Sequence, residues 1–236
     1  MSEQEFSAHR KSVAMLAEDG FRAELVDSTQ AARLFPGSGV LGGTFNPPHI
    51  GHLILAQEAF WQVELDRVLL MPVREAADKV IEQDPGAEER YLMCELAAGA
   101  AEWLDASRIE VDRPGPSYSA DTLRQLADER PGDELVMVLG GDRAASLPQW
   151  REPSEILRLA TLAVARRDAV GEEQVREALA GFGADDRVRF FDMPGIRVSS
   201  SIVRERVAAR RPFELFLPER VAQRIHEVGL YGGVVA

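Results

Sequence analysis

The sequence predicts an α/β protein in which an open parallel sheet carries helices on both faces. From Gly39 onward, short apolar and β-branched runs alternate with longer amphipathic stretches, the pattern of repeated strand–helix–strand units. The chain has 236 residues, of which 45% are hydrophobic, enough to bury one sizeable core. Such sheets bind ligands beyond the carboxyl ends of their strands. A site is therefore expected in the loops that follow the predicted strands.

Six runs fit buried strands, and seven stretches between and after them fit helices. The strands are expected at residues 40–45, 67–73, 108–111, 134–139, 161–165 and 188–192. The helices are expected at residues 50–63, 88–104, 119–130, 153–159, 172–180, 199–209 and 218–228. Ser119 and Ser199 stand at the starts of two of these helices, where serine is favoured.

Residues 1–38 fall outside this alternation, so we expect an N-terminal extension at 1–38 and one domain at 39–236. Val13, Leu16 and Ala17 suggest a short helix, and residues 36–39 have the composition of a linker. A packed extension, a disordered tail and a misplaced start site all fit. The sequence assigns the extension no role.

Composition limits the partners of the chain. A net charge of −12 repels nucleic acid and anionic membranes, so neither is expected as a partner. A nucleotide site remains compatible, because a few basic groups and a helix N-terminus suffice to bind one phosphate chain. The sequence has no long apolar run, no export signal and a single cysteine, Cys94, so we expect a cytoplasmic protein with a buried structural thiol. A homo-oligomer stays open.

The strongest motif runs from Gly42 to His52, between the first predicted strand and helix. Glycine there lets backbone N–H groups approach a phosphate, and the helix adds its positive end. His49 and His52 are three residues apart, which places both imidazoles in the first helical turn. An ordinary strand-to-helix loop is the alternative, but the complete string at this junction favours a phosphate site.

A second motif, Val198 to Arg204, carries three serines and an arginine at a predicted helix start. Hydroxyls and free N–H groups there can hold phosphate oxygens, and Arg204 can add a charge-assisted contact. Alone, the pattern would indicate only an N-capped amphipathic helix. Its pairing with the histidine motif favours the phosphate interpretation.

With these two motifs, residues 40–231 resemble the HxGH nucleotidyltransferase superfamily and, within it, the nicotinate mononucleotide adenylyltransferase family. Three further segments are similar to elements around the pyridine nucleotide of that family: residues 116–123, 140–142 and 147–150. The resemblance implies a Rossmann-like sheet and adenylyl transfer from ATP to nicotinate mononucleotide in NAD biosynthesis. It implies Mg²⁺ that arrives with ATP, because no carboxylate pair stands out as a protein metal site.

The resemblance also assigns roles to individual residues. The catalytic group is His49, His52, Lys79 and Arg204. The ATP-binding group adds Gly42, Gly43, Thr44, Phe45, Ser199, Ser200 and Ser201 to the two histidines and Arg204. The substrate-binding group is Ser119, Asp142 and Trp150, with the indole expected to stack on the pyridine ring.

One position departs from the family pattern. Asp78 stands where a histidine is usual, although Lys79 keeps the cation that follows it. A carboxylate there would repel a triphosphate unless it binds metal or turns outward.

Three other functions were weighed against this one. Aminoacyl-tRNA synthetases share the letters His-Ile-Gly-His, but this chain lacks their lysine-rich loop, anticodon-binding domain and basic face. A closer alternative is an adenylyltransferase for nicotinamide mononucleotide or another small phosphorylated substrate. The non-enzymatic alternative is a nucleotide-binding module that has lost turnover, for which Asp78 would be the trace.

Overall fold

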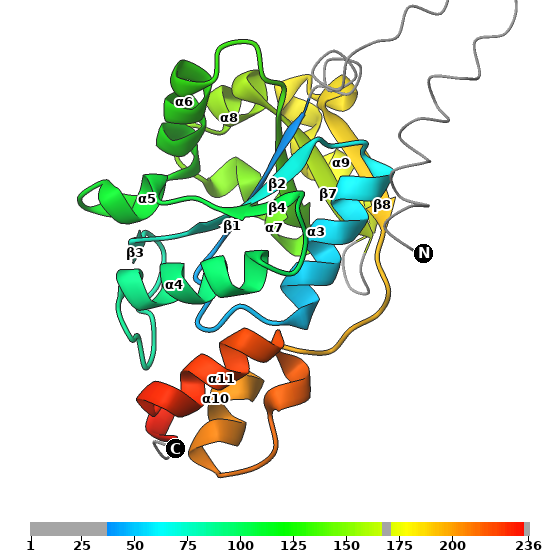
Figure 1. Cartoon of the computed structure of the whole chain (residues 1–236). Helices are drawn as coiled ribbons and strands as arrows, with labels where there is room; N and C mark the ends of the chain where they lie inside the picture. Colours follow the sequence, from blue (N-terminus) through cyan, green and yellow to red (C-terminus); the bar gives the residue numbers. More distant parts are fainter. Residues whose placement is uncertain (1–36, 167–170, 234–236) are drawn as a thin grey trace, which may run out of the picture. The chain divides into compact units, whose positions relative to one another are not determined.

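The computed structural model describes residues 37–166 and 171–233, which build the predicted parallel sheet (Figure 1). The strands of the main sheet pair in the order β4-β2-β1-β6-β7-β8, and all their pairings are parallel. They are β1 (Ser38–Gly43), β2 (Arg67–Pro72), β4 (Leu104–Ala106), β6 (Leu135–Gly140), β7 (Ala160–Arg166) and β8 (Val188–Asp192). A separate pair, β3 (Glu75–Ala76) and β5 (Pro116–Ser117), joins two loops.

The α-helices occupy the connections between strands and the end of the chain. They are α3 (Ile50–Gln62), α4 (Ala87–Ala98), α5 (Ile109–Asp112), α6 (Ser119–Glu129), α7 (Gly141–Ser146), α8 (Pro153–Leu159), α9 (Glu172–Leu179), α10 (Ser200–Ala208) and α11 (Glu219–Val228). Short 3₁₀ turns lie at η2 (Leu147–Gln149), η3 (Ala180–Phe182), η4 (Asp185–Arg187), η5 (Glu214–Phe216) and η6 (Leu230–Gly232).

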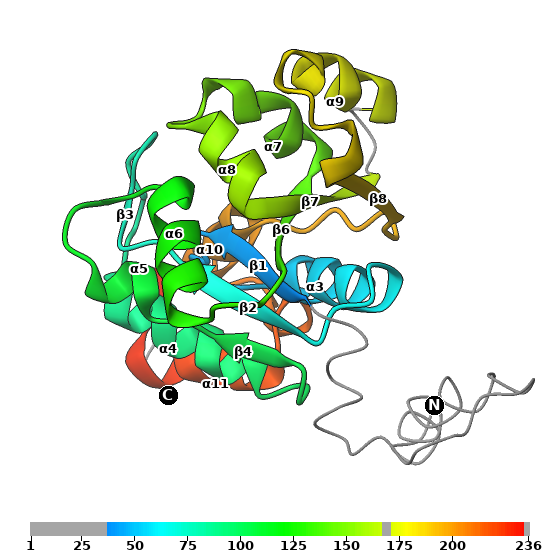
Figure 2. The ribbon, with the colours of Figure 1, turned by 90° about the horizontal axis from the view of Figure 1, so that it is seen from above.

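Alternating side chains of the strands send their apolar groups to two faces of the sheet. On one face, Met71, Met137 and Leu162 pack with buried residues of α6, α7, α8 and α9. On the other face, α3 contacts β1, β2, β7 and β8, while α4 contacts β2 and β4. Figure 2 shows α3 and α4 on the opposite side of the sheet from α8 and α9. Helices therefore cover both faces, as the sequence predicts.

The chain reverses its direction of travel across the sheet between β1 and β6. After β1 the chain proceeds to β2 and β4 on one side, and it then returns to β6, β7 and β8 on the other. The connections that leave β1 and β6 diverge at this point, the switch point beside which sheets of this type bind ligands. The histidine motif follows β1 and the 140–150 segment follows β6, so both start at this switch point.

At the edge of the sheet one predicted element is wrong and another ends earlier than predicted. The strand expected at 108–111 is the short helix α5, where Arg108 and Asp112 form an i,i+4 ion pair at 2.8 Å. The helix expected at 88–104 ends at Ala98, because Gly99 caps it, and Leu104 instead begins edge strand β4. The six-residue helix α7 was not expected at all.

The beginning of the domain also differs from expectation. The expected linker at 36–39 contributes Ser38 and Gly39 to β1, where they pair with β2 and β6. A Cβ at Gly39 would lie 2.8 Å from Leu65, so this backbone is packed rather than free. The helix expected near Val13 to Ala17 lies outside the described residues. Within those residues no helix has the length and apolar character needed to cross a bilayer. Cys94 is buried, as expected, and burial raises the pKa of its thiol.

Candidate nucleotide-binding site

The two motif histidines lie together at the start of α3. His49 is the N-cap, with extended backbone, and its N–H donates to Nδ1 of His52 at 3.1 Å. The two imidazole rings stack with centroids 3.7 Å apart, and the Phe45 ring meets His52 edge-on at 4.9 Å. His49 is buried and His52 is half-buried. The pair therefore presents a fixed imidazole surface at a helix N-terminus, where anions are favoured.

Gly51 is the residue that lets the His49 ring take this position. A Cβ at Gly51 would lie 3.1 Å from both Cε1 and Nδ1 of His49, closer than ordinary van der Waals contact. The spacing of the motif thus has a steric reason besides approach to phosphate.

The second motif meets the first in space. Ser200 Oγ donates to the carbonyl of Pro47 at 2.8 Å, and Arg204 Nη1 donates to the carbonyl of Asn46 at 2.9 Å. These contacts join residues more than 150 positions apart in the sequence. The histidine motif from Gly42 to His52 (the imidazole loop) and α10 (the serine–arginine helix) therefore converge. Binding of one triphosphate by both motifs requires this arrangement.

The serines of this motif differ in what they do. Ser199 is the N-cap of α10, and its hydroxyl accepts from the N–H of Ile202 at 3.2 Å. Ser200 is engaged with Pro47, while Ser201 is exposed. Ser199 thus caps the helix and Ser200 ties it to the histidine loop. The N-capped helix is confirmed, and the phosphate interpretation stays a prediction.

Arg204 keeps donors that the protein does not fully use. Its side chain is 11% exposed, and its nearest carboxylate, Glu82, lies 3.8 Å away on a side chain that is 83% exposed. Within the described residues, its Nε is buried and has no hydrogen-bond partner. A buried donor without a partner is costly, so this guanidinium retains the capacity to donate to a further acceptor.

Asn46 ties the histidine loop to two distant segments. Its Nδ2 donates to the carbonyl of Glu82 at 2.8 Å, and its Oδ1 accepts from the Tyr231 hydroxyl at 2.8 Å. Burial raises the pKa of Tyr231, so this hydroxyl remains a neutral donor. Asn46 lies within the histidine motif, but its letter alone predicts no role, and Tyr231 carries no signal of its own in the sequence.

Arg90 was also missed as a site residue, although it holds the loop that follows β1. Its side chain is fully buried and forms an ion pair with Asp84 at 2.8 Å. Its remaining donors contact the carbonyls of Thr44 at 3.1 Å, Val73 at 2.6 Å and Arg74 at 2.9 Å. One guanidinium thus fixes the ends of two site loops, which follow β1 and β2.

Lys79 and Asp78 lie in the loop after β3, and both are exposed. Asp78 Oδ2 pairs with Arg143 Nη1 at 3.4 Å. The carboxylate at the position of the family histidine is therefore matched by a cation from α7. Lys79 stays at the exposed surface of the loop, three residues before Glu82.

The expected substrate-binding residues follow β5 and β6. Ser119 begins α6, and Asp142 lies in the first turn of α7, where its Oδ1 would lie 2.9 Å from a Cβ at Gly140. Trp150 Nε1 donates to Ser146 Oγ at 3.1 Å, and the guanidinium carbon of Arg143 lies 4.7 Å from the centre of the indole ring.

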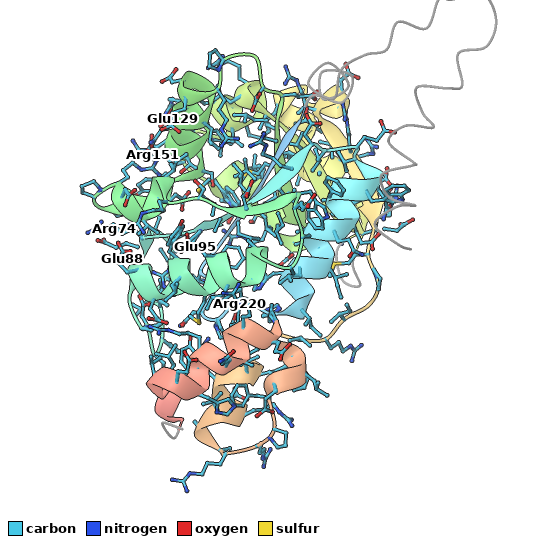
Figure 3. The ribbon with its side chains drawn as sticks, in the orientation of Figure 1. Arg74, Glu88, Glu95, Glu129, Arg151 and Arg220 are labelled. Atoms are coloured by element: carbon cyan, nitrogen blue, oxygen red, sulfur yellow. The ribbon has the colours of Figure 1, made fainter. Side chains whose placement is uncertain are left out.

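A second cation stands beside the start of α6. Arg151, labelled beside α6 in Figure 3, lies over the Tyr118 ring at 4.6 Å. It also pairs with Asp121 at 3.5 Å and with Glu152 at 3.4 Å. Local carboxylates thus neutralise Arg151 more fully than Arg143.

A buried polar cluster of Glu110, Arg113 and Thr122 anchors the 116–123 segment. Thr122 Oγ1 donates to Glu110 Oε1 at 2.6 Å and accepts from Arg113 Nη2 at 2.7 Å. Glu110 is 5% exposed, and burial raises the pKa of its carboxyl, against the opposing effects of Thr122 and Arg113. Because the sequence predicts a strand at 108–111, it assigns no role to Glu110.

Fold and site together have the organisation of a nucleotidyltransferase of the α/β class, with the two motifs that are predicted to bind phosphate gathered at the switch point of a parallel sheet. A family model described as cytidylyltransferase-like matches residues 40–206. A relative from Corynebacterium kroppenstedtii is 35% identical over 202 residues, which is 86% of this chain and 94% of the relative. One from Roseiflexus sp. is 38% identical over 193 residues, 82% of this chain and 96% of the relative. Both bear the name "Probable nicotinate-nucleotide adenylyltransferase", and the chain belongs to this family.

Solved structures agree on the fold. Plasmodium falciparum nicotinic acid mononucleotide adenylyltransferase complexed with NaAD superposes with a TM-score of 0.69 at 14% identity, covering 85% of this chain and 100% of that one. The same protein complexed with APC gives a TM-score of 0.68 at 13% identity, with the same coverage. Likeness at this identity supports the shared architecture of sheet and helices.

Proposed function

We propose that residues 39–236 transfer the AMP moiety of ATP to the 5′-phosphate of nicotinate mononucleotide, as a step of NAD biosynthesis. The products are deamido-NAD and pyrophosphate. The observation that carries the proposal is the convergence of the imidazole loop with the serine–arginine helix at the switch point. Membership of the nicotinate-nucleotide adenylyltransferase family supports the choice of substrate.

The reaction needs positioning and charge neutralisation rather than a nucleophilic side chain. A 5′-phosphate oxygen attacks the α-phosphorus of ATP, a new P–O bond forms, and the bond to the β-phosphate oxygen breaks as pyrophosphate leaves. The attacking phosphate is already an anion at neutral pH, so no general base is required. Donors aimed at the developing negative charge lower the barrier.

The ATP half of the site would use the convergent residues. His49 and His52 would contact the phosphates, and Arg204 would direct its unpartnered Nε at the same anion. Residues 42–45 would line the nucleotide, while Ser201 and the first N–H groups of α10 would add donors. Lys79, on its exposed loop, would meet the triphosphate when the loop approaches the nucleotide.

Magnesium would enter as part of the nucleotide substrate. Among residues 37–166 and 171–233, no group of three histidine, cysteine or acidic side chains could hold a metal ion. Members of this class use ATP with a divalent ion, and an ion held mainly by phosphate oxygens needs few protein ligands. When bound, it neutralises charge on the triphosphate.

The mononucleotide half would use residues after β5 and β6. Ser119 would bind on the nicotinate side, Asp142 would contact ribose hydroxyls or order the site, and the Trp150 indole would stack on the pyridine ring. The pairing of Asp78 with Arg143 weakens the case for a nucleotide-binding module without turnover, because Arg143 offsets the negative charge that would repel the triphosphate.

Pyrophosphate release tests the proposal. Purified protein is mixed with ATP, Mg²⁺ and either nicotinate or nicotinamide mononucleotide, and pyrophosphate is measured. We expect turnover with nicotinate mononucleotide. Pyrophosphate with neither compound, despite measurable ATP binding, would overturn the proposal and leave the nucleotide-binding module. As a control on mechanism, His52→Ala should lower the rate on the order of a hundredfold with folding intact, because one preorganised donor is lost. A near-normal rate would contradict the role given to His52.

A further inference from the structure

Arg143, in α7, contacts both the Trp150 indole and Asp78 in the loop after β3. Its guanidinium lies 4.7 Å from the centre of the Trp150 ring and pairs with Asp78 at 3.4 Å. The side chains of Arg143 and Asp78 are 53% and 60% exposed, so water screens this pair and it can be separated readily. Arg143 thus lies on the Trp150 ring proposed to stack on the pyridine, and it is held by Asp78, a carboxylate that a carboxylate ligand can replace.

We propose that Arg143 selects the acid form of the pyridine nucleotide by binding the nicotinate carboxylate in exchange for Asp78. The inference rests on the proposed function and deepens it. Planar guanidinium matches a planar carboxylate with two parallel hydrogen bonds, whereas a neutral carboxamide accepts one at most from the same group. Asp78 thus holds the position on Arg143 that the substrate carboxylate would take when nicotinate mononucleotide binds.

Trp150 makes the exchange geometrically reasonable. Its indole N–H donates a hydrogen bond to Ser146 Oγ at the end of α7, which fixes the orientation of the ring. A pyridine stacked on that ring brings its carboxylate to the ring edge, within the reach of a long side chain that starts in α7. The Arg143 guanidinium, which lies over the same ring, would move from the ring face toward its edge to meet that carboxylate.

The neighbouring Arg151 fits this role less well. It is already paired with two carboxylates, Asp121 and Glu152, and it lies over Tyr118 rather than Trp150. A nicotinate carboxylate would have to compete with both. Asp78, by contrast, is the single carboxylate paired with Arg143 among the described residues.

Two substitutions should change the KM for nicotinate mononucleotide in opposite directions, and a third should have an intermediate effect. Arg143→Gln should raise the KM for nicotinate mononucleotide about tenfold, the loss of one charge-assisted contact, while the KM values for nicotinamide mononucleotide and ATP stay near wild type. Asp78→Asn should lower the KM for the acid several-fold, because the competing carboxylate is removed. Arg143→Lys should fall between wild type and Arg143→Gln, since it keeps the charge but loses the fork.

Arg176→Gln provides the matched control. Arg176 also lies over an aromatic ring, Phe190 at 5.0 Å, and also pairs with a carboxylate, Glu172 at 2.9 Å, but neither partner belongs to the site. Its KM values for both mononucleotides should match wild type. Calorimetric titration of each variant with nicotinate mononucleotide measures the same preference without turnover.

The outcomes separate the two proposals. No turnover by the wild-type protein with either mononucleotide refutes the proposed function. If the wild-type protein turns over and Arg143→Gln leaves the ratio of the KM values for the acid and amide mononucleotides unchanged, the role of Arg143 is refuted while the proposed function stands. A ratio that changes only in Arg151→Gln assigns the selection to Arg151 and likewise overturns the inference.

Discussion

Arg90→Lys tests whether one buried guanidinium holds the two loops of the ATP half. Arg90 is fully buried and makes four contacts, with Asp84 and with the carbonyls of Thr44, Val73 and Arg74. Lysine keeps the charge but concentrates its donors on a single atom, so it cannot reach acceptors spread around a planar fork. At least two charge-assisted contacts are lost, each worth about 1.5 to 3 kcal/mol.

The expected loss in the free energy of unfolding is therefore about 3 kcal/mol or more. Urea unfolding followed by circular dichroism measures it, with an unchanged slope against denaturant as the sign that the same surface is exposed. Because Thr44 lies in the loop before the histidines, we also expect the KM for ATP to rise.

Arg108→Lys is the matched control. Arg108 also contacts two acceptor groups through its fork, Glu88 and Asp112, but its side chain is 40% exposed. Exposed pairs contribute little, so this variant should lose far less stability than Arg90→Lys. Equal losses in the two variants, or a loss below about 1 kcal/mol for Arg90→Lys, would show that the buried fork does not hold the loops.

Two further predictions concern the pH response and the fit of the histidine pair. Burial raises the pKa of Glu110 in the folded protein above its usual value, so the folded state binds more protons and stability falls as pH rises through this raised pKa. Glu110→Gln should remove that part of the fall, measured as unfolding free energies at pH 5 and pH 8; equal pH dependence in both proteins would rule out the raised pKa. In Gly51→Ala, the new Cβ displaces the His49 ring, so kcat/KM for ATP should fall about tenfold, whereas Gly181→Ala, which meets nothing within 4 Å, should not change it. A normal rate in Gly51→Ala would mean that the ring position is unimportant.

The sequence predicts best where the physical signal is local. The strand at 188–192 and the helix at 153–159 are confirmed residue for residue. The prediction fails at 108–111, where Ile109 and Val111 imitate the alternation of a strand. In the structure, however, the consecutive residues Glu110 and Val111 are both buried on a helical turn. Two buried neighbours contradict strand periodicity, but burial cannot be read from the letters.

Contacts between distant segments explain what the sequence does not show in the site. The motif residues His49 and Arg204 were identified from local patterns and resemblance. Their convergence depends on hydrogen bonds to the backbone carbonyls of Pro47 and Asn46, which any residue type could supply. The pair of Asp78 and Arg143 is likewise invisible until the loop after β3 meets α7. Asp78 therefore looked like a defect in the motif, although the fold provides its partner.

The acidic chain creates a place for a triphosphate through the kind of acceptor that it gives to its arginines. On the outer surface, arginines such as Arg158 and Arg176 are held by carboxylates, which cancel their charge. In the ATP half, Arg204 is held mainly by a backbone carbonyl, whereas the charge of the buried Arg90 is cancelled by Asp84. A carbonyl orients a guanidinium without cancelling its charge, so positive potential survives locally although the chain carries a net charge of −12. A carboxylate buried against Arg204 would orient it equally well but would repel the nucleotide. Glu82 lies 3.8 Å away, but its side chain is 83% exposed, so water and salt screen its charge.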